Sequence, residues 1–180
     1  MKATGVVRRI DELGRIVIPK EIRRTLKIRE GTPLEIYSGD NGELLLKKYS
    51  PITELAEIAN DICKSIAVGT NKSVLISNME KIIATSGPGS AMFLNKNIDS
   101  VIEKLINERK PRLIDQRETK SMIFFDSNIC TYCFCPIINC GDVYGGIFLF
   151  DNYGNVSESD TCIIKAFADF LSIQIGWYEK

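Results

Sequence analysis

Histidine is absent from this 180-residue chain. Histidine is the side chain that most often transfers protons near neutral pH, and it is also the commonest ligand of transition metals. Its absence counts against an acid–base enzyme, against haem ligation and against a histidine kinase. We therefore expect no catalytic residue, no resident cofactor and no metal site.

Long apolar runs are also absent. The sequence holds no stretch of about 18 consecutive apolar residues, which a membrane-spanning helix would need. The N-terminus lacks the charged head and apolar stretch of a signal peptide. We expect a cytoplasmic protein without membrane contact, in which the cysteines are mostly reduced thiols. The six cysteines are Cys63, Cys130, Cys133, Cys135, Cys140 and Cys162.

Four of the cysteines are closely spaced, at Cys130, Cys133, Cys135 and Cys140. The spacing is compatible with a zinc site or a redox switch. On a strand, however, Cys133 and Cys135 share one face while Cys130 points to the other, so four-fold coordination would need a bulge or a turn. We expect buried or neutral thiols, and zinc or redox chemistry is the alternative.

The charge is balanced over the whole chain, with 23 basic and 23 acidic residues, but not along it. Residues 1–48 hold 11 Lys and Arg against 7 Asp and Glu, whereas residues 49–180 hold 12 against 16. This asymmetry indicates a basic module joined to an acidic one. We predict a first domain over residues 1–50, the start of a linker helix over residues 51–55, and a second domain over residues 56–180.

Alternating apolar residues predict a β-hairpin at the start of the basic module. Residues 4–10 would form its first strand, residues 11–14 its turn and residues 15–18 its second strand. Pro19 suits the first turn of a helix that ends near Gly31. A second hairpin is expected over residues 33–37 and 43–48.

The basic module is small for an independent fold. A unit of about 48 residues with one short helix and no disulfide buries too little apolar surface to be stable alone. A second copy would complete its core. We therefore expect an obligate, interleaved homodimer.

The basic residues of this module are concentrated around the first turn and the helix. Guanidinium groups bind phosphates and can also read the O6 and N7 edge of guanine, so clustered arginines are typical of a DNA surface. A solvated charged face is the alternative explanation. The candidate DNA-binding residues are Arg8, Arg9, Arg15, Arg23 and Arg24.

The block from Asp11 to Leu26, DELGRIVIPKEIRRTL, together with GTPLEIY over residues 31–37, closely resembles the AbrB family of bacterial transition-state regulators. The resemblance implies a swapped-hairpin dimer in which a looped-hinge helix presents arginines to double-stranded DNA. Gly14 would be the hinge glycine. The family's DNA-contacting arginines correspond to Arg8, Arg15, Arg23 and Arg24, with Arg9 as a basic neighbour.

Residues 51–180 show a different pattern. A helix begins at Ser50-Pro51, and its apolar residues form either a seam for another helix or the buried face of an ordinary amphipathic helix. The seam is Ile52, Leu55, Ala59, Ile62 and Ile66. Strands are expected over 73–77, 81–85, 122–125, 131–138 and 143–150, and helices over 98–108 and 157–178.

The final expected helix carries two adjacent apolar stripes, so it can cover a sheet and also meet a second copy. One stripe is Ile163, Phe167, Phe170 and Trp177, and the other is Ile164, Ala168, Leu171, Ile175 and Tyr178. The family resemblance extends more weakly over residues 56–178. There it implies a GAF-like α/β domain, which either senses a small molecule of unknown identity or only oligomerises. The overall fold class is α+β.

The resemblance implies a sequence-specific regulator, both activator and repressor, of sporulation genes. It would act on the nucleoid of the developing forespore as a homotetramer, with dimers formed by the first domain and joined through the second. An antitoxin-like autoregulator with a fused sensor is the alternative. An enzyme built on the second domain would need a cofactor, because histidine is missing.

Overall fold

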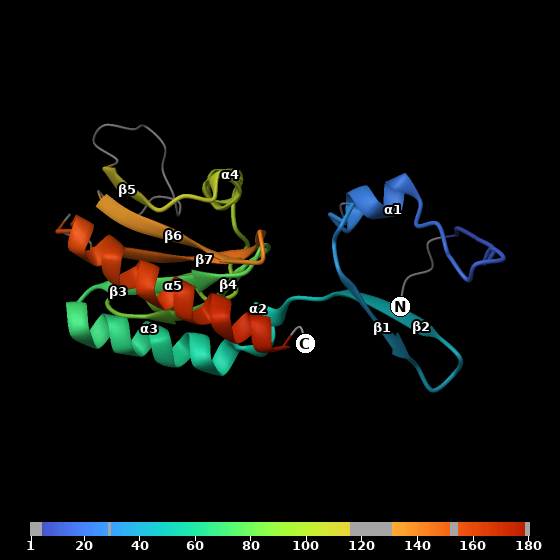
Figure 1. Ribbon diagram of the computed structural model, residues 1–180, viewed down its shortest axis with the longest axis horizontal. Coiled ribbons are helices and arrows are strands. Elements are labelled where there is room, and N and C mark those ends of the chain that lie inside the picture. The colour runs from blue at the N-terminus through green and yellow to red at the C-terminus, as the bar shows by residue number, and fades with distance from the viewer. Residues whose placement is uncertain (1–4, 29, 116–130, 152–154, 179–180) are drawn as a thin grey trace. The chain divides into compact units, whose positions relative to one another are not determined.

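The computed structural model describes residues 5–28, 30–115, 131–151 and 155–178. The chain divides into two compact units, Met1–Tyr49 and Ser50–Lys180. Each unit has its own sheet, and Figure 1 labels the α-helices and β-strands of both.

The first unit consists of a turn, a short helix and a hairpin. Helix α1 (Lys20–Thr25) is followed by the antiparallel strands β1 (Leu34–Ser38) and β2 (Leu44–Lys48). The backbone N–H of Gly39 donates to the carbonyl of Glu43 at 2.8 Å and closes the loop between the two strands. The predicted second hairpin is therefore confirmed.

The predicted first hairpin is wrong in its strands, because residues 5–10 and 15–18 form none. The turn between them is present: the backbone N–H of Asp11 donates to the carbonyl of Arg15 at 3.1 Å. Apolar side chains that the hairpin would bury remain exposed, Val7 at 88% and Val17 at 71%. A lone two-stranded hairpin is at best marginally stable in water, and no described residue of this unit covers Val7 or Val17.

No described residue of the first unit is buried. The hydrophobic effect is the main free energy that opposes the conformational entropy of the unfolded chain. A unit without a buried side chain has no core of its own from which to draw that free energy. The expectation of a core shared with a second copy stays a prediction, and this exposure agrees with it.

The second unit is built on a five-stranded antiparallel sheet in the order β4-β3-β7-β6-β5. Its strands are β3 (Ser73–Ser77), β4 (Ile82–Ser86), β5 (Arg112–Asp115), β6 (Thr131–Asn139) and β7 (Asp142–Asp151). Its helices are α2 (Pro51–Glu54), α3 (Ala56–Thr70), the 3-10 helix η1 (Ser90–Phe93), α4 (Ser100–Glu108) and α5 (Glu158–Tyr178).

Helices cover both faces of this sheet. Helices α3 and α5 lie side by side on one face, and α4 lies on the other (Figure 1). One hydrophobic cluster fills the space beneath α3 and α5, and a second cluster lies between the sheet, α4 and η1. The unit is thus a three-layer sandwich with two separate apolar cores.

Most elements predicted for this unit are confirmed to within a few residues. The structure also contains two elements that were not predicted, β5 and η1. The strand expected over residues 122–125 lies outside the described residues.

The helix after Ser50 departs from the predicted seam. It is interrupted at Leu55, which has φ −87° and ψ 18° and separates α2 from α3. Its apolar residues all lie in the core of their own unit, so they form the buried face of an amphipathic helix and not a seam for a second copy. They are Ile52, Leu55, Ala59, Ile62 and Ile66, each at most 5% exposed.

No helix among the described residues is both long enough and apolar enough to cross a membrane.

Candidate nucleic-acid interface

The five candidate arginines of the first unit, Arg8, Arg9, Arg15, Arg23 and Arg24, are all exposed. Arg8 and Arg9 precede the turn that begins at Asp11, and Arg15 follows it. Arg23 and Arg24 lie in the last turn of α1. Among these five, and within the described residues, only Arg15 has an acidic partner. The charge of the other four is available to an external anion.

The turn before Arg15 is held by a single side chain. The Oδ1 atom of Asp11 accepts hydrogen bonds from the backbone N–H groups of Leu13, at 3.0 Å, and Arg15, at 2.8 Å. Gly14 has φ 76° and donates its backbone N–H to the carbonyl of Asp11 at 3.0 Å. Glycine adopts this left-handed conformation without strain, which agrees with the hinge role that the family resemblance implies for Gly14.

Asp11 also binds the side chain of Arg15. Its Oδ2 atom lies 2.8 Å from the Nε atom of Arg15. Hydrogen bonds from the backbone N–H and then the guanidinium of Arg15 hold the pKa of the Asp11 carboxyl below its ordinary value. The sequence interpretation missed Asp11. An Asp at the first position of a turn, four residues before an arginine, was the signal that could have found it.

The arginines of α1 lie beside a tight helix end. The helix ends at Thr25, earlier than the predicted end near Gly31. Lys27 takes the left-handed conformation with φ 51°, and the backbone N–H of Ile28 donates to the carbonyl of Arg23 at 2.8 Å. These bonds satisfy free carbonyls at the helix end. They fix the backbone of Arg23 while its side chain remains exposed.

The five arginines lie on two different elements of the first unit. Arg8, Arg9 and Arg15 lie beside the turn that begins at Asp11, whereas Arg23 and Arg24 lie in the last turn of α1. Both groups are exposed.

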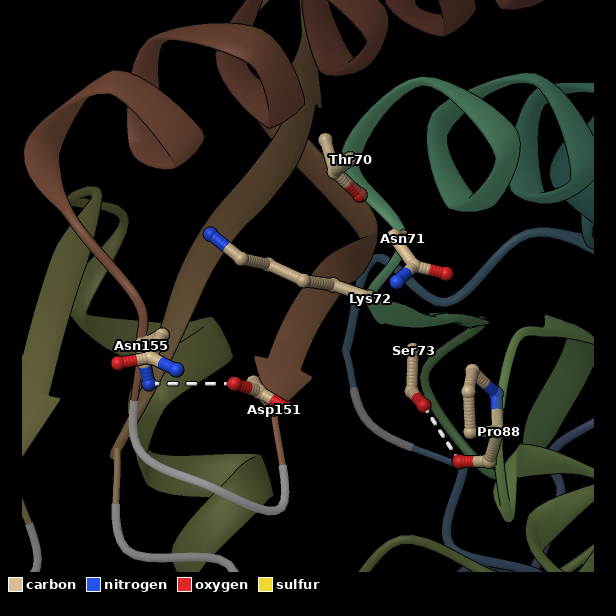
Figure 2. A pocket seen from close by; sticks show the side chains of 7 residues that line it. All are labelled: Thr70, Asn71, Lys72, Ser73, Pro88, Asp151 and Asn155. Carbon is tan, nitrogen blue, oxygen red and sulfur yellow. Dashed lines mark hydrogen bonds between the residues drawn. The ribbon is translucent and has the colours of Figure 1, made fainter.

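The second unit has a polar cleft of about 440 Å³, shown in Figure 2. The Asp151 carboxylate accepts the backbone N–H of Asn155 at 3.3 Å, and the Ser73 hydroxyl donates to the carbonyl of Pro88 at 2.6 Å. The lining residues are Thr70, Asn71, Lys72, Ser73, Pro88, Asp151 and Asn155.

The lysine of this cleft is already paired. Its ammonium nitrogen lies 2.6 Å from the Asp160 carboxylate. That neutralised lysine is a weak binding group for a phosphate. The small-molecule ligand expected for this unit stays a prediction.

The other face of the sheet is packed with aromatic rings. The centroids of Phe134 and Phe148 are 4.8 Å apart, and Phe93 meets Phe150 edge to face at 5.9 Å. All four rings are buried. This core is therefore closely packed in the part that the structure describes.

The cysteine prediction can be examined at five of six positions. Cys133 and Cys135 are buried on the same face of β6, as predicted, and Cys63 is buried in the same core. Burial raises the pKa of each of these three thiols to about 12, which disfavours the thiolate that zinc binding or redox chemistry needs. Cys140 and Cys162 are exposed and unpaired. Cys130 lies outside the described residues.

Helix α5 buries one of its two predicted apolar stripes. Ile164, Ala168, Leu171 and Ile175 lie in the core beneath the helix, while the side chain of Tyr178 is not described. Phe167 of the other stripe is partly buried. The remaining apolar side chains of α5 stay exposed at Ile163 (37%), Phe170 (43%), Ile173 (55%) and Trp177 (66%).

Two family models match the chain. Residues 54–176 match the model described as stage V sporulation protein T C-terminal, transcription factor. Residues 7–54 match the model described as antidote-toxin recognition MazE, bacterial antitoxin. The boundary between the two matches lies close to that between the two units.

Relatives of known name are similar in sequence to both units of the chain. The chain is 41% identical over 176 residues to stage V sporulation protein T of Bacillus subtilis (strain 168), which covers 97% of this chain and 99% of that protein. It is 61% identical over 51 residues to the transition state regulatory protein AbrB of the same organism, covering 28% of this chain and 52% of that protein. The resemblance of the first module to the AbrB family is confirmed.

Solved structures identify the fold of the second unit. The GAF domain from Acinetobacter phosphoenolpyruvate-protein phosphotransferase superposes with a TM-score of 0.60 at 9% identity, covering 69% of this chain and 84% of that chain. At such low identity the likeness shows the fold alone. The predicted GAF-like fold is confirmed.

Proposed function

Because the chain belongs to the stage V sporulation protein T family and regulates transcription in sporulation, we propose that five arginines of its first unit bind specific sequences of double-stranded DNA. These residues are Arg8, Arg9, Arg15, Arg23 and Arg24. The regulator both activates and represses its target genes, on the nucleoid of the developing forespore.

The exposure of these arginines is the observation that carries the proposal. Four of them have no acidic partner within the described residues, and the fifth, Arg15, is held by Asp11 through Nε. The guanidinium group of an arginine can donate two hydrogen bonds at once, either to a phosphate or to the O6 and N7 atoms of a guanine. A surface with this chemistry attracts DNA even though the chain as a whole carries no net charge.

A second copy is needed to complete the first unit. None of its described apolar side chains is buried, and many are exposed, including Ile36 at 65% and Leu44 at 64% on the β1–β2 hairpin. Pairing two copies would bury these side chains and double the set of arginines. The first unit is therefore proposed as the homodimer interface.

The second unit is proposed to join dimers into a homotetramer through the exposed side of α5. Phe170 and Trp177 lie on that side, where a matching helix would remove them from water. Phe170→Glu in the full chain should reduce the tetramer to dimers in sedimentation analysis. Asn107→Glu adds the same charge to an exposed position of α4 and should leave the tetramer intact.

The DNA assignment is tested by replacing each arginine singly with alanine and titrating DNA binding against salt. Loss of a base contact should weaken binding by about 1–3 kcal/mol, and loss of a phosphate contact should lower the salt slope by about one. Lys104→Ala removes an exposed cation from α4 of the second unit and serves as the matched control. If all five variants bind like the control, the proposed surface is wrong.

The antitoxin alternative is supported by one observation, the match of residues 7–54 to the antitoxin model. An antitoxin of this kind would neutralise a toxin encoded beside it. A toxin gene next to this one, whose product co-purifies with the chain, would favour that alternative. If no toxin gene lies beside this one, regulation of transcription remains the proposed function of the first unit.

A further inference from the structure

The two carboxylate oxygens of Asp11 bind different groups. Oδ1 accepts the backbone N–H groups of Leu13 and Arg15 and so closes the turn. Oδ2 accepts the Nε–H of the Arg15 side chain at 2.8 Å. One residue therefore shapes the loop and also holds a guanidinium that projects from it.

We propose that Asp11 is a positioning residue that fixes the guanidinium of Arg15 for reading a base, which rests on the function proposed above. Because Asp11 engages Arg15 through Nε, the terminal nitrogens Nη1 and Nη2 remain without a partner in the described part of the chain. Two terminal N–H groups can bond to both O6 and N7 of a guanine. Asp11 therefore holds the guanidinium of Arg15 so that Nη1 and Nη2 are already oriented toward a base.

The position of the carboxylate explains why this role concerns sequence discrimination more than overall affinity. A negative charge on a DNA-facing turn repels phosphates, so Asp11 weakens general attraction to DNA. The pair is also exposed, with side chains 70% (Arg15) and 42% (Asp11) accessible, and such pairs add little to folding stability. The Asp11–Arg15 pair favours base recognition instead, because an arginine that is already held in place loses less conformational freedom when it binds.

The different partners of the two oxygens allow a specific test. Asp11→Asn keeps an Oδ1 acceptor for the backbone of the turn but replaces Oδ2 with an amide NH2, which cannot accept from Nε. Glu12→Gln removes the same charge from the neighbouring exposed residue, for which the described residues give no hydrogen bond. The two variants have the same net charge, but only Asp11→Asn loses the acceptor for the Nε–H of Arg15.

The measurement uses the full chain and two DNA probes. One is a duplex that the parent protein selects from a randomised pool, and the other is the same duplex with its sequence shuffled. Both Asp11→Asn and Glu12→Gln should bind the shuffled duplex at least as tightly as the parent. The ratio of affinities for selected and shuffled DNA should fall about tenfold in Asp11→Asn and stay within about twofold in Glu12→Gln.

An equal ratio in Asp11→Asn and Glu12→Gln would overturn the inference. The Nε–H resonance of Arg15 gives a direct check, since its protection from exchange should be lost in Asp11→Asn. If Asp11→Asn disturbs the turn, Asp11→Ser keeps one backbone acceptor and should show the same loss of discrimination. Unchanged discrimination in a serine variant with an intact turn would also overturn the inference.

Arg15→Ala separates this inference from the proposed function. If Arg15→Ala discriminates as well as the parent, Arg15 reads no base and this inference fails. If its salt slope also matches that of the parent, its assignment to the DNA surface fails as well. If Arg15→Ala loses discrimination while Asp11→Asn retains it, Arg15 still reads DNA and only the positioning role of Asp11 is wrong.

Discussion

The ammonium group of Lys72 lies 2.6 Å from the carboxylate of Asp160, 88 residues further along the chain. The two side chains are only 17% and 6% exposed. Asp160 also accepts the backbone N–H of Ser157 at 2.8 Å and its hydroxyl at 2.9 Å. These bonds attach the first turn of α5 to the chain just before β3.

This network makes stability depend on acid pH. Burial raises the pKa of the Asp160 carboxyl, but bonds from Lys72 and Ser157 outweigh burial and leave the pKa below its ordinary value of 3.8. A carboxyl with a lowered folded-state pKa contributes stability that is fully present above the unfolded-state pKa and is lost as the pH falls through the folded-state pKa. The second unit should therefore lose stability below about pH 4, as measured by urea unfolding. In Asp160→Asn this part of the pH dependence should disappear.

The buried position of the pair predicts a large effect of removing one partner. Lys72→Met leaves the Asp160 carboxylate without its counter-charge and should lower the free energy of unfolding by about 3 kcal/mol. The exposed pair of Lys165 and Asp169, at 2.7 Å, is the matched control. Lys165→Met should shift the urea midpoint much less, and equal shifts would show that burial of Lys72 does not matter.

The sequence could not predict the Lys72–Asp160 pair, because nothing local links residues so far apart. Periodicity did predict β3, β4, β6, β7 and α5, since their apolar residues repeat at strand or helix spacing. Periodicity alone could not show whether an apolar face packs in its own unit or against a second copy. The stripe that includes Ile62 and Ile66 is buried in its own unit, whereas Phe170 and Trp177 of α5 remain exposed.

The buried stripe gives a test of the revised role of α3. Ile66 is 2% exposed and Val68, two residues later on the same helix, is 86% exposed. Ile66→Ala should lower the free energy of unfolding by about 3 kcal/mol, since it leaves a cavity. Val68→Ala should change it by less than about 0.5 kcal/mol. Similar losses in urea unfolding would mean that this face of α3 does not form the core.

The candidate site was predictable only in part. The arginines follow from composition and from the family resemblance, and all of them are exposed as expected. Asp11 was missed because an acidic residue contradicts the simple electrostatics of a DNA surface. The strands of the first hairpin, over residues 5–10 and 15–18, were predicted but are absent, because a lone hairpin is marginally stable until another surface covers its apolar residues.

The exposed apolar residues of the first unit predict that it folds only on association. A fragment of residues 1–50 should be dimeric, and its melting temperature should rise with protein concentration, because folding and association are linked. Circular dichroism melts at several concentrations, with sedimentation analysis of the same samples, measure this. A monomeric fragment with a concentration-independent melt would contradict the shared core.

Gly145 lies at a point in β7 where no side chain fits. It has φ 154°, and a Cβ atom at this position would lie 1.9 Å from the carbonyl oxygen of Ser77 on β3. Because this neighbour is the backbone of the last residue of β3, which pairs with Gly146 of β7, it cannot move without disturbing the pairing of β3 with β7. Gly145→Ala should therefore lower the free energy of unfolding by about 3 kcal/mol or more.

Gly69 is the matched control for Gly145. It lies in α3, and a methyl group added to it would have no atom of another element within 4 Å, so Gly69→Ala should raise the free energy of unfolding by up to about 1 kcal/mol. Opposite signs for the same substitution in urea unfolding are expected, since one methyl group enters open solvent and the other meets a carbonyl oxygen. A tolerated alanine at residue 145 would show that β3 and β7 are not packed this closely.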